Sequence, residues 1–220
     1  MCFYLLILCA TALSQIYALS SSEEIFTHIY DNKLWGQNEQ GEGFSGSGST
    51  LKETTMYRNF LQNFLNTHKI KSVVDLGCGD WTFSKEINWS QIDYIGIDVV
   101  KSVIQKNVKL FETPSIRFIH ADGLSSTLPS ADLLICKDVL QHLPNKEIIE
   151  IMKQFGNFKY CLITNDIDLD CPSNNNTDIK TGECRALNLM APPFSVAGSP
   201  IFIYRGWPDL FTKQVLLIKN

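Results

Sequence analysis

The sequence has no excess of positive charge and no cysteine arrangement typical of a metal site. Its 220 residues include 19 Lys and Arg against 23 Asp and Glu, which gives a net charge of −4. Proteins that bind nucleic acid usually carry a basic surface, so this balance argues against nucleic acid as a partner. The seven cysteines form no C-x-x-C pair and no Cys/His cluster with zinc spacing, so we predict no metal.

Long apolar runs are also scarce, and the clearest one stands at the amino terminus. Residues 2–13 are apolar and are followed by Ile16-Tyr17-Ala18, an acceptable cleavage site. Residues 1–18 therefore resemble a secretory signal peptide, and the run is short for an ordinary membrane span. No Lys or Arg precedes the run, so an uncleaved hydrophobic segment and a misassigned start remain alternatives. The leader favours a secreted or exported protein.

A secretory route would affect two features of the sequence, a possible disulfide bond and possible glycosylation sites. Cys171 and Cys184 share one polar loop and are the expected bridge there, although two reduced thiols are an equal alternative. Asn88 and Asn175 match the glycosylation acceptor pattern.

The length and the 45% hydrophobic content predict one main domain. We assign it to residues 50–220. Residues 19–49 precede it as a helix over 21–35 and a Gly/Ser-rich loop, which is either a linker or a lid over a ligand.

A strand that breaks at two glycines organises the domain. Asp75-Leu76-Gly77-Cys78-Gly79 closes an apolar strand over 70–76, and a helix is predicted over 81–87. Glycines let the backbone approach a ligand, and a helix start leaves amide hydrogens unpaired. The next strand, 93–98, ends at Asp98, about 20 residues on, where an acid can bind ribose hydroxyls. Thr82 replaces the third glycine of the dinucleotide fingerprint, which disfavours NAD.

Strands and helices alternate along the rest of the chain. Strands are predicted over 115–120, 132–136 and 159–164, with helices over 100–111 and 145–155 between strands, which is typical of a parallel sheet. Strands over 201–204 and 214–218, joined by a turn at 206–208, close the sheet. Before the first strand, Thr50-x-x-Glu53 reads as a capping box for a helix. Its predicted apolar stripe is Leu51, Met56, Tyr57, Phe60, Leu61, Phe64 and Leu65.

The D-x-G-x-G run, Asp98 and this element order resemble class I S-adenosylmethionine (SAM)-dependent methyltransferases. The resemblance implies an α/β fold with a Rossmann-like, seven-stranded, mostly parallel sheet, helices on both faces and a C-terminal antiparallel hairpin. It also implies SAM as the cofactor. The residues expected at the cofactor are Asp75, Gly77, Gly79, Asp98, Asp122, Gly123, Arg58 and Trp81.

Several of these residues also fit structural roles. Asp98 can cap a helix, Asp122-Gly123 is a common turn pair, Arg58 can be a solvated helix charge, and Trp81 can pack in the core.

Catalytic residues are expected after the fourth strand, where Cys136, Lys137 and Asp138 stand. Asp138 could stabilise the sulfonium or take a proton, although Asp138-x-x-Gln141 also fits a helix cap, and His142 could act as the base. Lys137 either points away from the donor or meets an anionic substrate. Farther on, Arg185 with Tyr204 and Arg205 could hold an acidic or phosphorylated acceptor.

We therefore predict methyl transfer from SAM to an O or N atom of a small molecule, or of a protein side chain. SAM is a cytosolic compound, so its use predicts the cytosol of the producing cell or of a receiving cell, and export into another cell or a misassigned start would each reconcile this with the leader. The alternative function is a non-catalytic exported domain that binds an adenosyl ligand. An NAD-dependent oxidoreductase is a weaker alternative.

Overall fold

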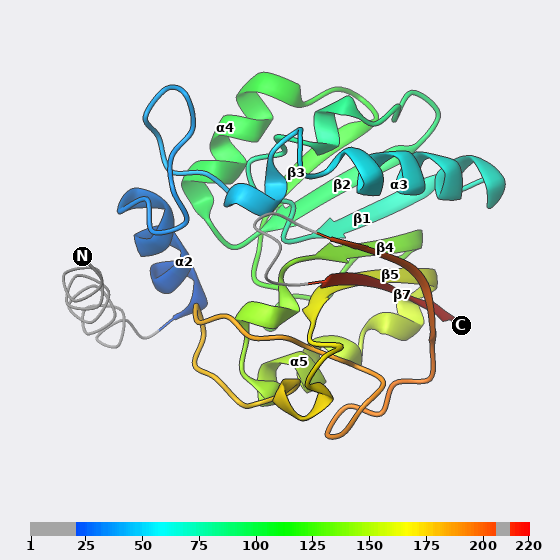
Figure 1. Ribbon diagram of the computed structural model, residues 1–220. Coiled ribbons are helices and arrows are strands. Elements are labelled where there is room, and N and C mark those ends of the chain that lie inside the picture. Colours follow the sequence, from blue (N-terminus) through cyan, green and yellow to red (C-terminus); the bar gives the residue numbers. More distant parts are fainter. Residues whose placement is uncertain (1–20, 206–211) are drawn as a thin grey trace.

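The computed structural model describes residues 21–205 and 212–220, so the predicted leader and the turn at 206–208 lie outside the described residues. Seven strands form one sheet in the order β3-β2-β1-β4-β5-β7-β6 (Figure 1). The first five strands are parallel, and β7 pairs antiparallel with both β5 and β6. The predicted fold class is confirmed.

The strand boundaries agree closely with the sequence pattern. The central strands are apolar over most of their length because helices cover both of their faces. The strands are β1 (Ser72–Leu76), β2 (Asp93–Asp98), β3 (Ile116–His120), β4 (Ala131–Lys137), β5 (Phe158–Ile167), β6 (Ser199–Arg205) and β7 (Thr212–Lys219).

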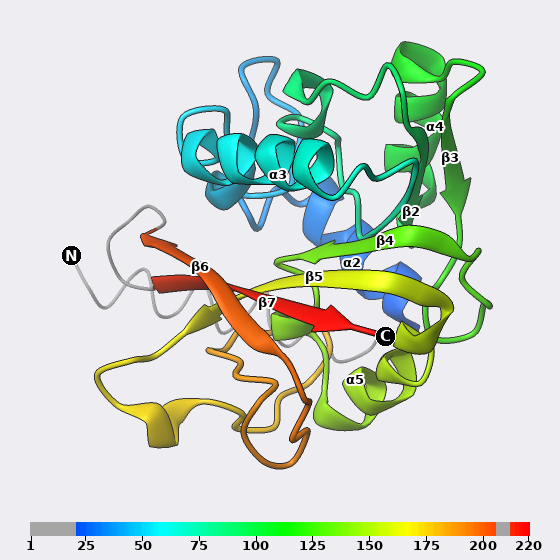
Figure 2. The same ribbon diagram turned by 90° about the vertical axis from the view of Figure 1, so that its right-hand side faces the viewer.

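Helices α3 (Thr55–Thr67) and α5 (Asn145–Met152) cover opposite faces of the sheet (Figure 2). Helix α3 buries Tyr57, Leu61, Phe64 and Leu65 in one apolar core. Helix α5 buries Ile148 and Ile151 in the other. Helix α4 (Lys101–Phe111) lies beside β2 and β3 and buries Val103 and Ile104. The sheet is thus enclosed, and its carboxyl edge is left for a site.

The helix predicted over 81–87 is wrong. Trp81 has a φ of +58°, and the segment contains only a short 3₁₀ turn, Ser84–Glu86. The side chain of Asp80 accepts a hydrogen bond from the Thr82 amide at 3.1 Å, which competes with helical pairing. Aromatic and hydroxylated residues here are also weak helix formers. The glycine turn therefore does not open an α-helix.

The predicted capping box at Thr50 is also wrong in its placement. The Thr50 hydroxyl accepts from the Glu53 amide at 3.4 Å, but the chain then makes another turn and α3 begins only at Thr55. As a result Leu51 and Met56 are 40% and 54% exposed instead of buried. Val108 of α4 and Ile149 of α5 are exposed too, although both lie on otherwise apolar helix patterns.

The amino-terminal helix α2 (Ser22–Asp31) is shorter than the predicted 21–35. Ser21 and Glu24 form a reciprocal capping box at its start, and the chain leaves the helix by way of Lys33, whose φ is +55°. The following loop packs on the main domain at the carboxyl edge of the sheet, next to α2 (Figure 1). No helix among the described residues is long and apolar enough to cross a membrane.

Candidate functional site

A pocket lies at the carboxyl edge of the sheet, between the strand ends and the amino-terminal segment. The turn after β1 and the ends of β2, β3 and β4 form one side of the pocket. Helix α2 and the loop after it form the other side. The lining residues include Tyr30, Trp35, Ser45, Ser49, Asp75, Gly77, Gly79, Asp98, Asp122, Gly123, Lys137, Asp138 and His142.

The two glycines of the turn hold conformations that other residues rarely adopt. Gly77 and Gly79 have φ values of +72° and +56°. A Cβ atom on Gly77 would lie 2.2 Å from Val139 Cγ2, and one on Gly79 would lie 2.3 Å from Ser45 Oγ. The turn is therefore built from backbone alone, which is the arrangement predicted for a close ligand approach.

Asp98 braces this turn and faces the pocket. One carboxylate oxygen accepts from the Gly79 amide at 3.0 Å and the other from the Val100 amide at 2.9 Å. Burial raises the pKa of Asp98, and these two amide hydrogen bonds oppose that rise. Each oxygen has a second lone pair for a ligand hydroxyl. The cap-like contact at Val100 and a ligand role are therefore compatible.

Asp75 lies beneath the turn and is only 4% exposed. The Tyr94 hydroxyl donates to its carboxylate at 2.6 Å. Burial raises the pKa of Asp75 from 3.8 to about 6, although the Tyr94 hydrogen bond works in the other direction. An ionised Asp75 is consequently destabilising near neutral pH.

This pKa shift predicts a pH-dependent stability effect. Because the pKa of Asp75 is raised in the folded state, its contribution to folding stability is most favourable below pH 3.8. This contribution is lost as the pH rises through 6. The free energy of unfolding of Asp75→Asn, relative to that of wild type, should therefore be about 1–2 kcal/mol higher at pH 8 than at pH 5. Urea unfolding at both pH values measures the difference. An equal effect at the two pH values would contradict the raised pKa.

Asp122 and Gly123 also line the pocket, after β3. The Asp122 side chain accepts from the Leu124 amide at 2.9 Å, as expected of a turn residue. Its carboxylate has remaining acceptor capacity toward the pocket, so both interpretations of Asp122 stay compatible with the structure.

The structure corrects the placement of two predicted cofactor residues. Arg58 is absent from the pocket wall and donates to the Leu51 carbonyl at 2.8 Å, because α3 begins one turn later than predicted. Trp81 is also absent from this wall. It is 4% exposed and packs against Tyr94, Phe111 and Phe118, with ring centroids 5.6, 5.0 and 5.3 Å away. Trp81 is a core residue.

Asp138 lies between two lysines and cannot act as a base near neutral pH. One oxygen accepts from Lys137, and the other accepts from Lys213 at 2.8 Å. The two ammonium groups outweigh burial and hold the pKa of Asp138 well below its usual range. The cap interpretation fails as well, because these oxygens contact lysines instead of helix amides. Lys137 is part of the pocket wall, whereas Cys136 is fully buried.

His142 remains a candidate base. Its Nδ1 lies 2.9 Å from the Glu183 carbonyl oxygen, which only a protonated nitrogen can contact favourably. Burial lowers the pKa of His142, so the ring is neutral near pH 7 and Nε2 carries a lone pair. The ring also packs 5.1 Å from the Trp35 ring at the pocket wall.

Of the three residues predicted to hold an acidic acceptor, Arg185 has a structural role. Arg185 is 8% exposed and donates to the Leu143 carbonyl and to the Asn145 side chain, at 2.8 and 2.9 Å. Tyr204 is buried against Tyr57, whereas Arg205 is exposed at the end of β6. Cys171 and Cys184 are free thiols. Among residues 21–205 and 212–220, no group of three His, Cys, Asp or Glu could hold a metal ion.

One part of the site comes from the amino-terminal segment and was not predicted residue by residue. Ser45 Oγ accepts from the Asp80 amide at 2.9 Å and lies 2.7 Å from the Tyr30 hydroxyl. The Ser45 amide donates to the Asp80 carboxylate at 3.2 Å. The two contacts between Ser45 and Asp80 span 35 residues, so only the lid alternative for the Gly/Ser-rich loop pointed toward them.

Comparisons with known proteins agree with this geometry. The family model described as a methyltransferase domain matches residues 73–158, which hold the glycine turn, Asp98, Asp122 and His142. This match covers 86 of the 220 residues and agrees with the resemblance to class I SAM-dependent methyltransferases predicted from the sequence. A comparison with curated proteins finds no match.

Solved methyltransferases share the fold at low sequence identity. The N-methyltransferase NodS from Bradyrhizobium japonicum WM9, in complex with S-adenosyl-L-homocysteine (SAH), is 14% identical with a TM-score of 0.60, covering 78% of this chain and 88% of that chain. Magnesium protoporphyrin IX methyltransferase from Synechocystis PCC 6803, with bound SAM, is 11% identical with a TM-score of 0.60, covering 92% and 99%. Human N-acetylserotonin methyltransferase is 14% identical with a TM-score of 0.56, covering 96% and 65%.

The residues that line the pocket fit SAM. The turn at Gly77 and Gly79 presents backbone without side chains at the pocket wall, and Asp98 offers carboxylate lone pairs beside it. Asp75 supplies a second buried carboxylate near the same turn. These groups suit a ligand with hydroxyl groups and a positively charged end, as SAM is.

Proposed function

We propose that this protein transfers the methyl group of SAM to an O or N atom of a small molecule. The observation that carries the proposal is Asp98 facing the pocket while it braces the backbone turn at Gly79. The same pocket continues past the turn to Lys137 and His142, which leaves room for an acceptor beside the donor. A protein side chain as acceptor is a second possibility that the same site would serve.

The chain's own residues mainly bind and position the reactants. SAM supplies an electrophilic methyl group, and in-line alignment of donor and acceptor is worth up to ~7–11 kcal/mol. Asp98 would accept ribose hydroxyls, and Asp75 would face the charged methionine end. Ser45 and Tyr30 fix the loop that covers the glycine turn. His142 Nε2 would receive the proton from an acceptor hydroxyl or amine.

Thermal melting with three ligands tests the proposal. A ligand at 100 times its Kd should stabilise the protein by ~2.7 kcal/mol. We expect SAM and SAH to raise the melting temperature and NAD to leave it unchanged. Stabilisation by NAD alone would contradict the proposal and favour the oxidoreductase. Binding of SAH without any methylated product from a metabolite extract would favour a non-catalytic exported domain.

Replacing His142 should lower turnover without loss of donor binding. A positioned base typically contributes ~10²–10⁴-fold, so His142→Gln should reduce kcat by about 100-fold or more with any acceptor that must lose a proton. The SAH Kd should stay within about threefold because His142 does not contact the glycine turn. Because burial lowers its pKa, wild-type kcat should fall only below the ordinary histidine pKa of about 6.5. A kcat within tenfold of wild type would exclude His142 as the base.

A further inference from the structure

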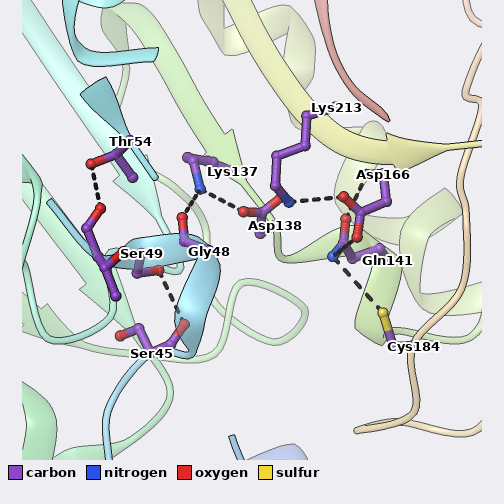
Figure 3. Close-up of polar contacts among 11 residues, drawn as sticks. Ser45, Gly48, Ser49, Thr54, Lys137, Asp138, Gln141, Asp166, Cys184 and Lys213 are labelled. Carbon is purple, nitrogen blue, oxygen red and sulfur yellow. Dashed lines mark hydrogen bonds and ion pairs between the residues drawn. The ribbon is translucent and has the colours of Figure 1, made fainter. Parts of the chain in front are cut away.

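A row of buried charges lies beside the pocket, at the edge of the sheet where β4 and β5 end and β7 begins. Lys137 ends β4, Asp166 lies near the end of β5, Lys213 lies at the start of β7, and Asp138 follows Lys137. Lys213 donates to Asp138 and to Asp166, at 2.8 Å each, and Lys137 donates to Asp138 (Figure 3). The four side chains are 4% to 15% exposed.

Stability alone gives no reason for this row. Buried ion pairs are expensive to desolvate, and apolar residues at such positions are often equally stable or more so. The residue before Lys137 on β4, Cys136, is apolar and fully buried, so the strand end itself does not require a charge. Charges retained at the edge of a reaction pocket therefore suggest a role in binding.

The amino-terminal loop covers the row in this structure. The Gly48 carbonyl accepts from Lys137 Nζ at 3.2 Å (Figure 3). A Cβ atom built on Gly48 would lie 3.6 Å from Asp138 Oδ2 and 3.8 Å from Lys213 Nζ. The Gly48 peptide thus sits in a space bounded by both lysines, and its carbonyl oxygen stands where a ligand oxygen could bind.

The hydrogen-bonding capacity of the row favours an anionic ligand over a cationic one. All four carboxylate oxygens of Asp138 and Asp166 already accept a hydrogen bond, from Lys137, Lys213 or Gln141. Each lysine has three N–H donors, and Lys213 uses two of them on aspartates. Lys137 uses one N–H on Asp138 and one on the Gly48 carbonyl, so departure of that carbonyl would leave two free donors on Lys137 beside one on Lys213, which suits an anionic group.

A second observation points the same way. The Tyr204 hydroxyl is buried, with its residue 4% exposed, and has no hydrogen-bond partner among the described residues. Tyr204 pairs with Lys213 in the register of β6 and β7, and burial together with the charge of Asp138 raises the pKa of its hydroxyl. Lys137 Nζ lies 5.6 Å from the Tyr57 ring and 5.3 Å from the Phe83 ring, so apolar walls flank the donors.

We propose that the methyl acceptor carries a carboxylate, which Lys137 and Lys213 bind in the place of the Gly48 carbonyl when the 45–50 loop shifts. A carboxylate oxygen is an sp² acceptor like the carbonyl oxygen that it replaces. The inference rests on the proposed methyl transfer, because it concerns the second half of the same pocket. The sequence predicted that Arg185 holds an acidic acceptor. The proposal gives this role to Lys137 and Lys213.

Isosteric probes test this acceptor class. 4-Hydroxybenzoate, 4-hydroxybenzamide and 4-hydroxybenzylamine share a ring and a phenol and differ in the charge of one group. Their binding is measured by calorimetry on the full chain, without and with saturating SAH. We expect the benzoate to bind at least tenfold more tightly than the other two. Equal or tighter binding of the amide or the amine, or no binding of the benzoate at millimolar concentration, would overturn the proposal.

A charge-neutral variant locates the effect. Lys213→Gln combined with Asp166→Asn removes one charge of each sign and keeps hydrogen-bonding groups, so the net charge is unchanged. It should weaken benzoate binding at least tenfold and leave the SAH Kd within threefold. Lys153→Gln with Glu150→Gln, an exposed ion pair, is the matched control and should change neither value. Benzoate binding unaffected by the first variant would contradict the role of Lys213.

SAH binding, measured first in each sample, separates the two claims. Loss of SAH binding in wild type would remove the proposed function itself. Retained SAH binding with no preference for the benzoate would remove only the carboxylate acceptor.

Discussion

Asp98→Ala should lower the affinity for SAH by about 100-fold or more. The carboxylate accepts from two backbone amides that shape the glycine turn, and it is the group placed to accept ribose hydroxyls. Hydrogen bonds to charged groups contribute ~1.5–3 kcal/mol each, and the substitution removes at least two. Calorimetric titration of SAH measures the change directly.

Two further variants separate binding from folding. Asp98→Asn keeps one acceptor oxygen for an amide and should bind SAH with intermediate affinity. Arg58→Ala should bind SAH like wild type, because the Arg58 guanidinium contacts the Leu51 carbonyl instead of the pocket. An unchanged Kd for Asp98→Ala, or a large loss for Arg58→Ala, would contradict the described site.

Gly77→Ala should destabilise the fold by several kcal/mol. Its φ of +72° costs a residue with a Cβ roughly 1–2 kcal/mol. The new methyl group would also lie 2.2 Å from Val139 Cγ2, and overpacking of this kind typically costs ~1–3 kcal/mol. Urea unfolding of the purified variant measures the loss.

Gly156→Ala is the matched control, because a Cβ there would meet no atom within 4 Å. It should be close to wild type in stability. Gly77→Ala combined with Val139→Ala should recover part of the loss, since the closest contact is with a Val139 methyl group. If Gly77→Ala is as stable as Gly156→Ala, the turn is not constrained as described.

The sheet was predictable because each buried strand carries its own apolar run. β2 was predicted at its observed boundaries, and Asp98 and the glycine turn followed from local spacing. The segment after the glycines was mispredicted because tertiary contacts of Trp81 with Phe111 and Phe118 override the local helical reading. The start of α3 was missed because a capping pattern at Thr50 also fits a turn.

The site was predicted where one segment supplies it and missed where distant segments meet. Asp138 lies in the pocket as predicted. It does not act as the base, because Lys213, 75 residues away in the sequence, forms an ion pair with its carboxylate. Ser45 and Gly48 were not identified because their partners are Asp80 and Lys137, far along the chain. A single sequence contains no local sign of such contacts.

A structure of the protein with bound SAH tests the central claim most directly. Our account predicts the ligand against the turn at Gly77 and Gly79, with its ribose hydroxyls within hydrogen-bonding distance of the Asp98 carboxylate. A ligand bound elsewhere, or an Asp98 that contacts only the Gly79 and Val100 amides in the complex, would contradict it.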